Sequence, residues 1–197
     1  MTKFRDSISG IILQGIRTTG HNFQHGMGYH TDKHAVEVVD SVIEILESFD
    51  CFTQTEKNSL LIAAAWHDAI YKVGSISNEN DSALKLMWCH SHSEKFDLEL
   101  SMQLIRGTQV ANHLSEDKVS PLQEILLDAD LVALSLPYDE FYYRQVLILK
   151  EHGLNESSID KSYMFLKQFL NKKTIYRTKY AIDKWEASAR SNIESLK

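Results

Sequence analysis

The stretch LLIAAAWHDAIY, residues 60–71, is apolar on every side of a helix apart from His67 and Asp68. A helix with apolar residues all round is buried on most sides, so this stretch predicts a buried helix. An ionised carboxylate in such a place costs several kcal/mol unless a charge or a metal compensates for it. Asp68 therefore needs a cation. A metal ion and a buried His67–Asp68 hydrogen bond are both acceptable explanations at this point.

The composition of the chain favours an all-α fold. The chain has 197 residues, of which 43% are hydrophobic, and this suits a single domain over residues 1–197 with one full-sized core. Two prolines and eight glycines leave little of the turn chemistry that a many-stranded sheet needs. We expect a bundle of about six to eight helices joined by short loops.

Apolar spacing and capping signals predict where these helices lie. A first helix is expected over residues 5–18, and the polar segment TTGHNFQHGMGYH after it is expected to be a loop. Thr31 can cap a helix to about Phe49, and the capping-box pattern TQTE, residues 53–56, precedes a helix to about Tyr71. Further helices are expected at 79–93, 97–110, 121–135, 138–152, 157–172 and 180–196.

A histidine occupies a core-facing position at the start of the second expected helix. Val38, Val42 and Ile45 follow the spacing of a buried edge, and four residues before Val38 stands His34. His34 is therefore predicted to point inward. A hydrogen-bonded core histidine is the alternative to a ligand here.

Two aspartates interrupt another apolar helix, EILLDADLVALSL, residues 124–136. Asp128 and Asp130 are two residues apart, so they face roughly opposite sides of a helix. Asp130 has apolar neighbours three and four residues away, whereas Asp128 shares its side with Glu124 and Ser135. We predict that Asp130 is the buried aspartate.

Two imidazoles and two carboxylates in apolar helices form a mixed nitrogen and oxygen ligand set for a divalent metal ion. We predict that His34, His67, Asp68 and Asp130 bind the metal, which could be Mn, Fe, Zn, Ni, Co or Mg, as one ion or two. Such a site supports hydrolysis of a phosphate ester, with metal-bound hydroxide as the nucleophile.

Two further polar residues are candidates for the same site. Glu79 could orient the attacking water or accept its proton, or it could merely suit the positive end of a helix dipole. A second oxygen of Asp68 could bridge to another ion, completed by Glu79 or His113. The sequence leaves open whether His113 or Tyr71 joins the site.

Charge and cysteine content exclude other classes of protein. The net charge is −6, and no long basic run lies on one predicted face, so a nucleic-acid partner is not expected. Cys51 and Cys89 cannot form a disulfide framework or a four-cysteine zinc site, which fits a reducing cytosol. The one basic cluster is interpreted as an ordinary solvated helix end; it comprises Lys172, Lys173, Arg177 and Lys179.

We expect neither export nor membrane insertion of the chain. No window of about 18 apolar residues occurs, and the apolar run near the N-terminus is too short for a signal peptide. We expect a cytoplasmic protein without a membrane partner.

The order His34, then His67 and Asp68, then Asp130 resembles the ligand order of the HD superfamily of metal-dependent phosphohydrolases. The resemblance covers roughly residues 29–151. It implies an HD-type helical bundle in which these four residues bind the metal.

Shorter motifs resemble two branches of that family. YHTDKHAVEVVD, residues 29–40, is similar to the Y-H-N-x-x-H-A-x-D-V pattern of cyclic-nucleotide phosphodiesterases, which implies that His34 is a ligand and His30 a general acid. Other segments resemble small bacterial HD proteins known as predicted phosphohydrolases; they are WHDAIY at 66–71, NENDSA at 78–83, Thr108 with His113, and DADL at 128–131 followed by Tyr142 and Glu151.

The chain also departs from the phosphodiesterase pattern. Thr31 stands where those enzymes have asparagine. Tyr71 stands where they have histidine and where many HD nucleotidases and alarmone hydrolases have glutamate. The resemblance therefore does not imply a particular substrate.

We expect hydrolysis of a small nucleotide-like phosphomonoester or phosphodiester, and a homodimer is compatible with the sequence. Two other functions remain open at this point. One is a di-iron oxygenase, because some HD relatives use a similar scaffold for oxygen chemistry. The other is a binding module whose metal site senses a nucleotide without turnover.

Overall fold

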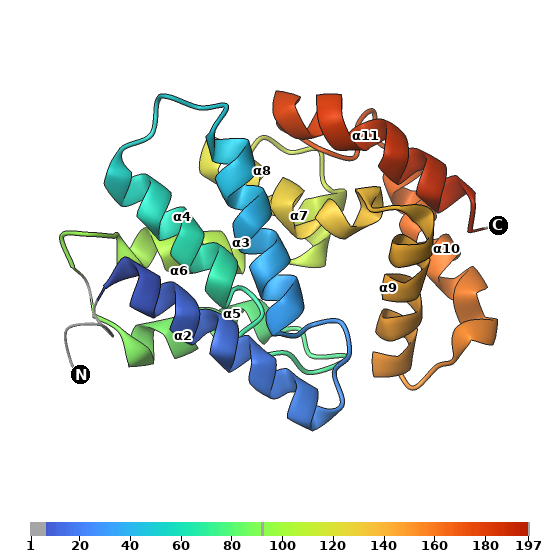
Figure 1. The fold of residues 1–197 in the computed structure, drawn as a ribbon, viewed down its shortest axis with the longest axis horizontal. Helices are drawn as coiled ribbons and strands as arrows, with labels where there is room; N and C mark the ends of the chain where they lie inside the picture. The colour runs from blue at the N-terminus through green and yellow to red at the C-terminus, as the bar shows by residue number, and fades with distance from the viewer. Residues whose placement is uncertain (1–6, 92, 197) are drawn as a thin grey trace.

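A computed structural model describes residues 7–91 and 93–196 of the chain. Within these residues the fold is all-α, as predicted, and the only β-type pairing is an isolated bridge between Ser93 and Phe96 (Figure 1). The described residues form ten α-helices and three short 3-10 helices, which is more than the six to eight helices expected and one α-helix more than the nine ranges predicted individually. None of the described helices is both long and apolar enough to span a membrane.

The α-helices are α2 (Ile8–Gly20), α3 (Asp32–Leu46), α4 (Gln54–Trp66), α5 (Asn78–Cys89), α6 (Leu98–Arg106), α7 (Val110–Leu114), α8 (Pro121–Asp130), α9 (Tyr138–Glu151), α10 (Ile159–Leu170) and α11 (Lys179–Glu194). The 3-10 helices are η1 (His21–His25), η2 (Val132–Ser135) and η3 (Glu156–Ser158). Residues 5 and 6, where the first helix was expected to begin, lie outside the described part of the chain.

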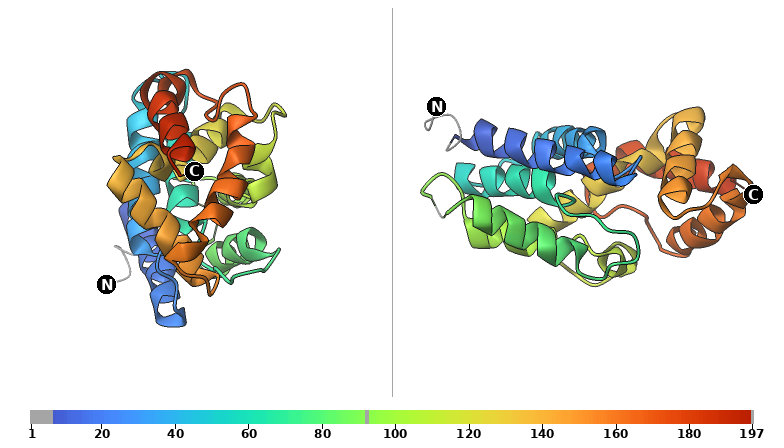
Figure 2. Two further views of the ribbon diagram at one scale, coloured as in Figure 1. Left: turned by 90° about the vertical axis from the view of Figure 1, so that its right-hand side faces the viewer. Right: turned by 90° about the horizontal axis from the view of Figure 1, so that it is seen from below.

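Helix α4 is surrounded by other helices, as its all-apolar sequence predicts. It packs against α2 and α3 on one side and α6 on another, so that it lies between two layers of helices (Figure 2). Its buried side chains include Leu60, Ile62 and Trp66. Helices α9 and α10 lie together at the other end of the long axis, and α11 packs against α10 (Figure 1).

A cap at its start and contacts with α2 at its end hold α4 in place. The predicted capping box is present: Thr53 Oγ1 accepts from the Glu56 N–H at 3.2 Å, and the Glu56 carboxylate accepts from the Thr53 N–H at 2.8 Å. At the other end, Trp66 Nε1 donates to the Ile11 carbonyl at 3.0 Å. A Cβ at Gly15 would lie 2.5 Å from the Trp66 ring, so only glycine allows α2 to approach α4 this closely.

Helix α4 ends at Trp66 and not near Tyr71, which corrects the predicted boundary. Backbone groups after the helix end are paired with side chains from distant segments. Asn22 Nδ2 donates to the Asp68 carbonyl at 2.9 Å, and Ser82 Oγ accepts from the Ile70 N–H at 3.0 Å. Because these partners satisfy groups that a longer helix would pair internally, the chain can turn directly after Trp66.

Candidate metal centre

The four predicted ligands come from three helix ends. His34 lies in the first turn of α3, His67 and Asp68 directly follow α4, and Asp130 is the last residue of α8. Adjacent residues on a helix point about 100° apart. Because α4 has already ended, the side chains of His67 and Asp68 can approach the same point.

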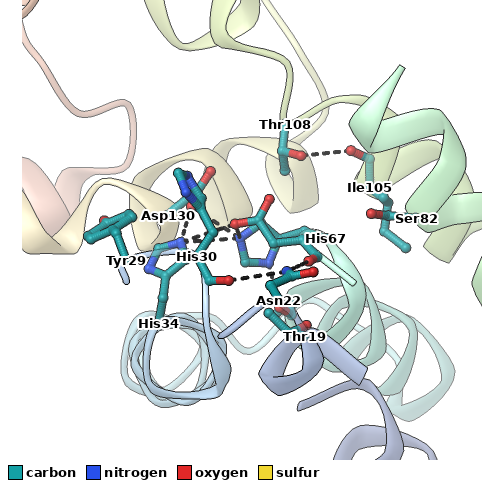
Figure 3. A network of polar contacts seen from close by, with 12 residues as sticks. Thr19, Asn22, Tyr29, His30, His34, His67, Ser82, Ile105, Thr108 and Asp130 are labelled. Atoms are coloured by element: carbon teal, nitrogen blue, oxygen red, sulfur yellow. Dashed lines mark hydrogen bonds and ion pairs between the residues drawn. The ribbon is translucent and has the colours of Figure 1, made fainter. Parts of the chain in front are cut away.

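The structure brings these four side chains together. His34 Nε2 lies 3.0 Å from Asp130 Oδ1 and 3.3 Å from His67 Nε2. His67 Nε2 lies 3.1 Å from Asp68 Oδ2 and 3.3 Å from Asp130 Oδ1. Asp68 Oδ2 is 3.6 Å from His34 Nε2. Figure 3 shows the His34 and His67 rings and the Asp130 side chain turned toward one another.

These distances fit a metal ion. His34, His67 and Asp130 each offer a donor atom within 4.8 Å of the others, a spacing at which they could hold one ion, and Asp68 Oδ2 lies beside both imidazoles. With bonds of about 2.1 Å, donor atoms separated by 3.0 to 3.6 Å subtend roughly 90° to 120° at the ion. This range covers octahedral and tetrahedral coordination.

The orientation of the His67 ring also suits a ligand. Its Nδ1 lies 2.7 Å from the Ala64 carbonyl oxygen, which can only accept a hydrogen bond, so Nδ1 carries a proton. In the neutral ring the lone pair is therefore on Nε2, the atom that faces the other three donors. A backbone partner that orients a ring in this way is typical of metal-binding histidines.

The carboxylates are ionised at neutral pH. Burial alone would raise the pKa of Asp68, but the neighbouring imidazoles of His67, His30 and His34 lower that pKa to about 2. Burial opposes the ionisation of Asp130 as well, and its contacts with His67, His113 and His34 hold its pKa well below the usual value. Two partly buried carboxylates at one point make the site attractive to a cation.

The predicted burial of the two α8 aspartates is wrong, although their opposite orientation is confirmed. Asp128 is the more buried residue, only 1% exposed, while Asp130 is partly exposed to the site. Asp128 accepts hydrogen bonds from the N–H groups of Arg177 at 2.8 Å and Thr178 at 2.7 Å. The segment before α11 thus covers Asp128, and desolvation there raises the pKa of Asp128 to about 6.

His113 joins the cluster from α7, a short helix that was not predicted separately. Its Nε2 lies 3.0 Å from Asp130 Oδ2, and the residue is buried. Lys172 Nζ donates to the His113 carbonyl at 2.7 Å, and Arg177 Nη2 donates to the Asn112 carbonyl at 2.7 Å. The interpretation of the basic cluster as a solvated helix end is therefore wrong for Lys172 and Arg177, which bind the carbonyls that end α7.

His30 lies beside the ligands and is held by Glu151. Its Nδ1 is 2.6 Å from Glu151 Oε2, while Glu151 Oε1 accepts from the N–H groups of Gly28, Tyr29 and His30 at 2.6 to 3.0 Å. Burial alone would raise the pKa of Glu151, but the hydrogen bond and charge of His30 and the backbone donors lower it. The His30 ring stacks on Tyr71 with centroids 3.6 Å apart.

Glu79 lines the same cavity as His30, His34, Asp68 and Asp130. Burial and the nearby carboxylates of Asp68 and Asp130 raise the pKa of Glu79. Tyr71, which the sequence left open, also lines this cavity. Sequence reasoning missed two further lining residues, Gln145 and Phe165, because a polar and an aromatic residue on amphipathic helices carry no signal of a site.

The fold and the site define an all-α protein with a buried histidine and aspartate cluster that could hold a metal ion. No family model matches the sequence, and no curated protein and no solved structure matches the chain. The function must therefore be argued from the site itself.

Proposed function

We propose that the protein is a metal-dependent phosphohydrolase that cleaves a small nucleotide-like phosphomonoester or phosphodiester. The observation that carries the proposal is the convergence of His34 Nε2, His67 Nε2, Asp68 Oδ2 and Asp130 Oδ1, with contacts of 3.0 to 3.6 Å among them. The order of these ligands along the chain and the motif around His30 support membership of the HD superfamily.

The proposed ligands would hold Mn, Fe, Zn, Ni, Co or Mg, as one ion or two. When bound, such an ion lowers the pKa of a water molecule and offsets negative charge on phosphoryl oxygens. A second ion would draw on the outer oxygen of Asp130 together with His113, which lie 3.0 Å apart.

His30 is suited to protonate the leaving oxygen. Glu151 accepts from its Nδ1, which leaves Nε2 as the nitrogen that can hand over a proton. The carboxylate of Glu151 stabilises the protonated ring, and the stack on Tyr71 fixes the plane of the ring. Positioning by a carboxylate in this way is a general feature of histidine acid–base catalysis.

Glu79 is suited to accept the proton of the attacking water. It lines the cavity, and its raised pKa brings it closer to the range in which a carboxylate acts efficiently as a general base near neutrality. The opposite roles of Glu79 and His30 follow from their different surroundings, since Glu79 lies near like charges and His30 is paired with a carboxylate.

A metal and substrate panel tests the proposal. The purified protein is stripped of metal, reloaded with each of the six ions and assayed on p-nitrophenyl phosphate and bis(p-nitrophenyl) phosphate, with Asp130→Asn as the inactive control. We expect hydrolysis with at least one ion and none with Asp130→Asn. If metal binds but no ester is cleaved, the binding-module alternative is favoured, and iron-dependent oxygen consumption would favour the oxygenase.

A further inference from the structure

The cavity at the metal centre extends over apolar side chains from the other end of the molecule. His34, Asp68 and Asp130 line a cavity of about 210 Å³. Its walls away from the ligands include Ile148 on α9 and Phe165 on α10. Leu134, Leu166 and Phe169 complete an apolar surface there. A ligand bound through its phosphate at the metal centre would place its organic part against these side chains.

The charge of the cavity limits what this organic part can be. The lining includes three carboxylates, those of Asp68, Glu79 and Asp130, and among the described residues it includes no lysine or arginine. Phosphate groups in proteins are usually bound by such cations or by metal ions. A single phosphate can rely on the metal centre and the histidines, but a second or third phosphate would meet apolar or acidic side chains.

Two uncharged polar side chains with little exposure line the same cavity. Gln145 on α9 is 3% exposed and Ser162 on α10 is 7% exposed, and both line the cavity. Both side chains can donate and accept hydrogen bonds, so they suit a ligand that offers an uncharged hydrogen-bonding group at this wall.

We infer that the substrate carries one phosphate and an uncharged organic group with a largely apolar face and a hydrogen-bonding substituent, and that polyphosphates are excluded. This inference rests on the proposed function and narrows its substrate class. The organic group lies against the apolar wall formed by α9 and α10. Phe165 and Gln145 are the residues that select it.

The binding of n-alkylphosphonates tests the inference, because these compounds keep one anionic phosphorus group and cannot be cleaved as esters. Dissociation constants are measured by calorimetry on the Mn²⁺-loaded protein for the series from methyl to hexyl. We expect the affinity to rise about fourfold for each added methylene until the cavity is full. An α,ω-diphosphonate of matched length should bind more weakly than the alkylphosphonate, because its second charge has no partner.

Variants on α9 and α10 identify the wall that the organic group contacts. Phe165→Ala should reduce the gain in affinity for each added methylene while leaving the affinity for methylphosphonate unchanged. Met164→Ala is the matched control, since Met164 is the adjacent residue of α10, is 63% exposed and does not line the cavity. Gln145→Met should remove the preference for a phosphonate with a terminal carboxamide over its alkyl counterpart.

Three results would overturn the inference: no phosphonate binding, an affinity independent of chain length, or tighter binding of the diphosphonate. A neighbouring cavity of about 570 Å³ is lined by Lys72, Lys85 and Tyr71. If Lys72→Ala or Lys85→Ala weakened the binding of the diphosphonate, the ligand would extend into that cavity instead. Hydrolysis of p-nitrophenyl phosphate is measured in parallel. If p-nitrophenyl phosphate is hydrolysed but the phosphonate affinity does not depend on chain length, only the inference is refuted. If the phosphonate affinity depends on chain length but no ester is hydrolysed, only the proposed function is refuted.

Discussion

Asp128→Asn and Asp130→Asn should separate the two aspartates of α8 into a structural and a ligand role. The two residues are close in sequence and make different contacts. Asp128 accepts from two backbone N–H groups before α11 at 2.7 and 2.8 Å, whereas Asp130 directs its oxygens at His34 and His113, each 3.0 Å away.

Asp128→Asn should destabilise the protein without removing metal. An asparagine can keep one acceptor but turns an NH2 group toward a backbone donor, and an unsatisfied buried group costs about 1–3 kcal/mol. For a chain of this size each kcal/mol lowers Tm by about 2–4 °C, so the expected decrease is about 2–12 °C. Adding Mn²⁺ should still raise the Tm of this variant.

Asp130→Asn should remove the metal-dependent stabilisation. Metal at about one hundred times its Kd stabilises the folded state by about 2.7 kcal/mol, which corresponds to a rise in Tm of about 5–11 °C in the wild type. The variant loses an anionic ligand, so its Tm should not respond to Mn²⁺. Thermal unfolding of the wild type and both variants by circular dichroism, with and without EDTA, gives the Tm values, and mass spectrometry gives the metal content. An equal loss of the metal response in both variants would refute the assignment of the two faces of α8.

Other predictions concern catalysis and the fold. His30→Ala should retain the metal and lose about 10²–10⁴ in kcat, with a larger loss on an alkyl ester than on p-nitrophenyl phosphate; equal losses on both would contradict the acid role. Glu151→Gln should also lower kcat with metal content unchanged, because a glutamine amide that donates to His30 Nδ1 stops Nδ1 from carrying a proton. The double variant should be no slower than His30→Ala, and additive losses would show that Glu151 acts elsewhere. Thr53→Ala should lower stability by about 0.5–2 kcal/mol in urea unfolding, and a changed metal affinity would contradict a purely local cap.

The sequence by itself determined the all-α class and singled out the four polar residues of the predicted ligand set. Helical spacing places His34 on the buried edge of α3, and the polar pair His67 and Asp68 stands out because its surroundings in sequence are apolar. Such signals are local: they depend on the helix period and on the free energy of burying a charge, and both can be read from neighbouring residues. The capping box at Thr53 is local in the same way.

Only the tertiary structure decided where the helices end and what covers each polar group. Helix α4 stops at Trp66 because Asn22 and Ser82 pair with the backbone after it. Asp128 is buried because the segment before α11, almost fifty residues later in the chain, donates two hydrogen bonds to it. His113 reaches Asp130 because Lys172 and Arg177 bind the end of α7. Each of these outcomes depends on hydrogen-bond partners that are distant in sequence, and the residues on either side of a helix end do not specify which distant groups will satisfy it.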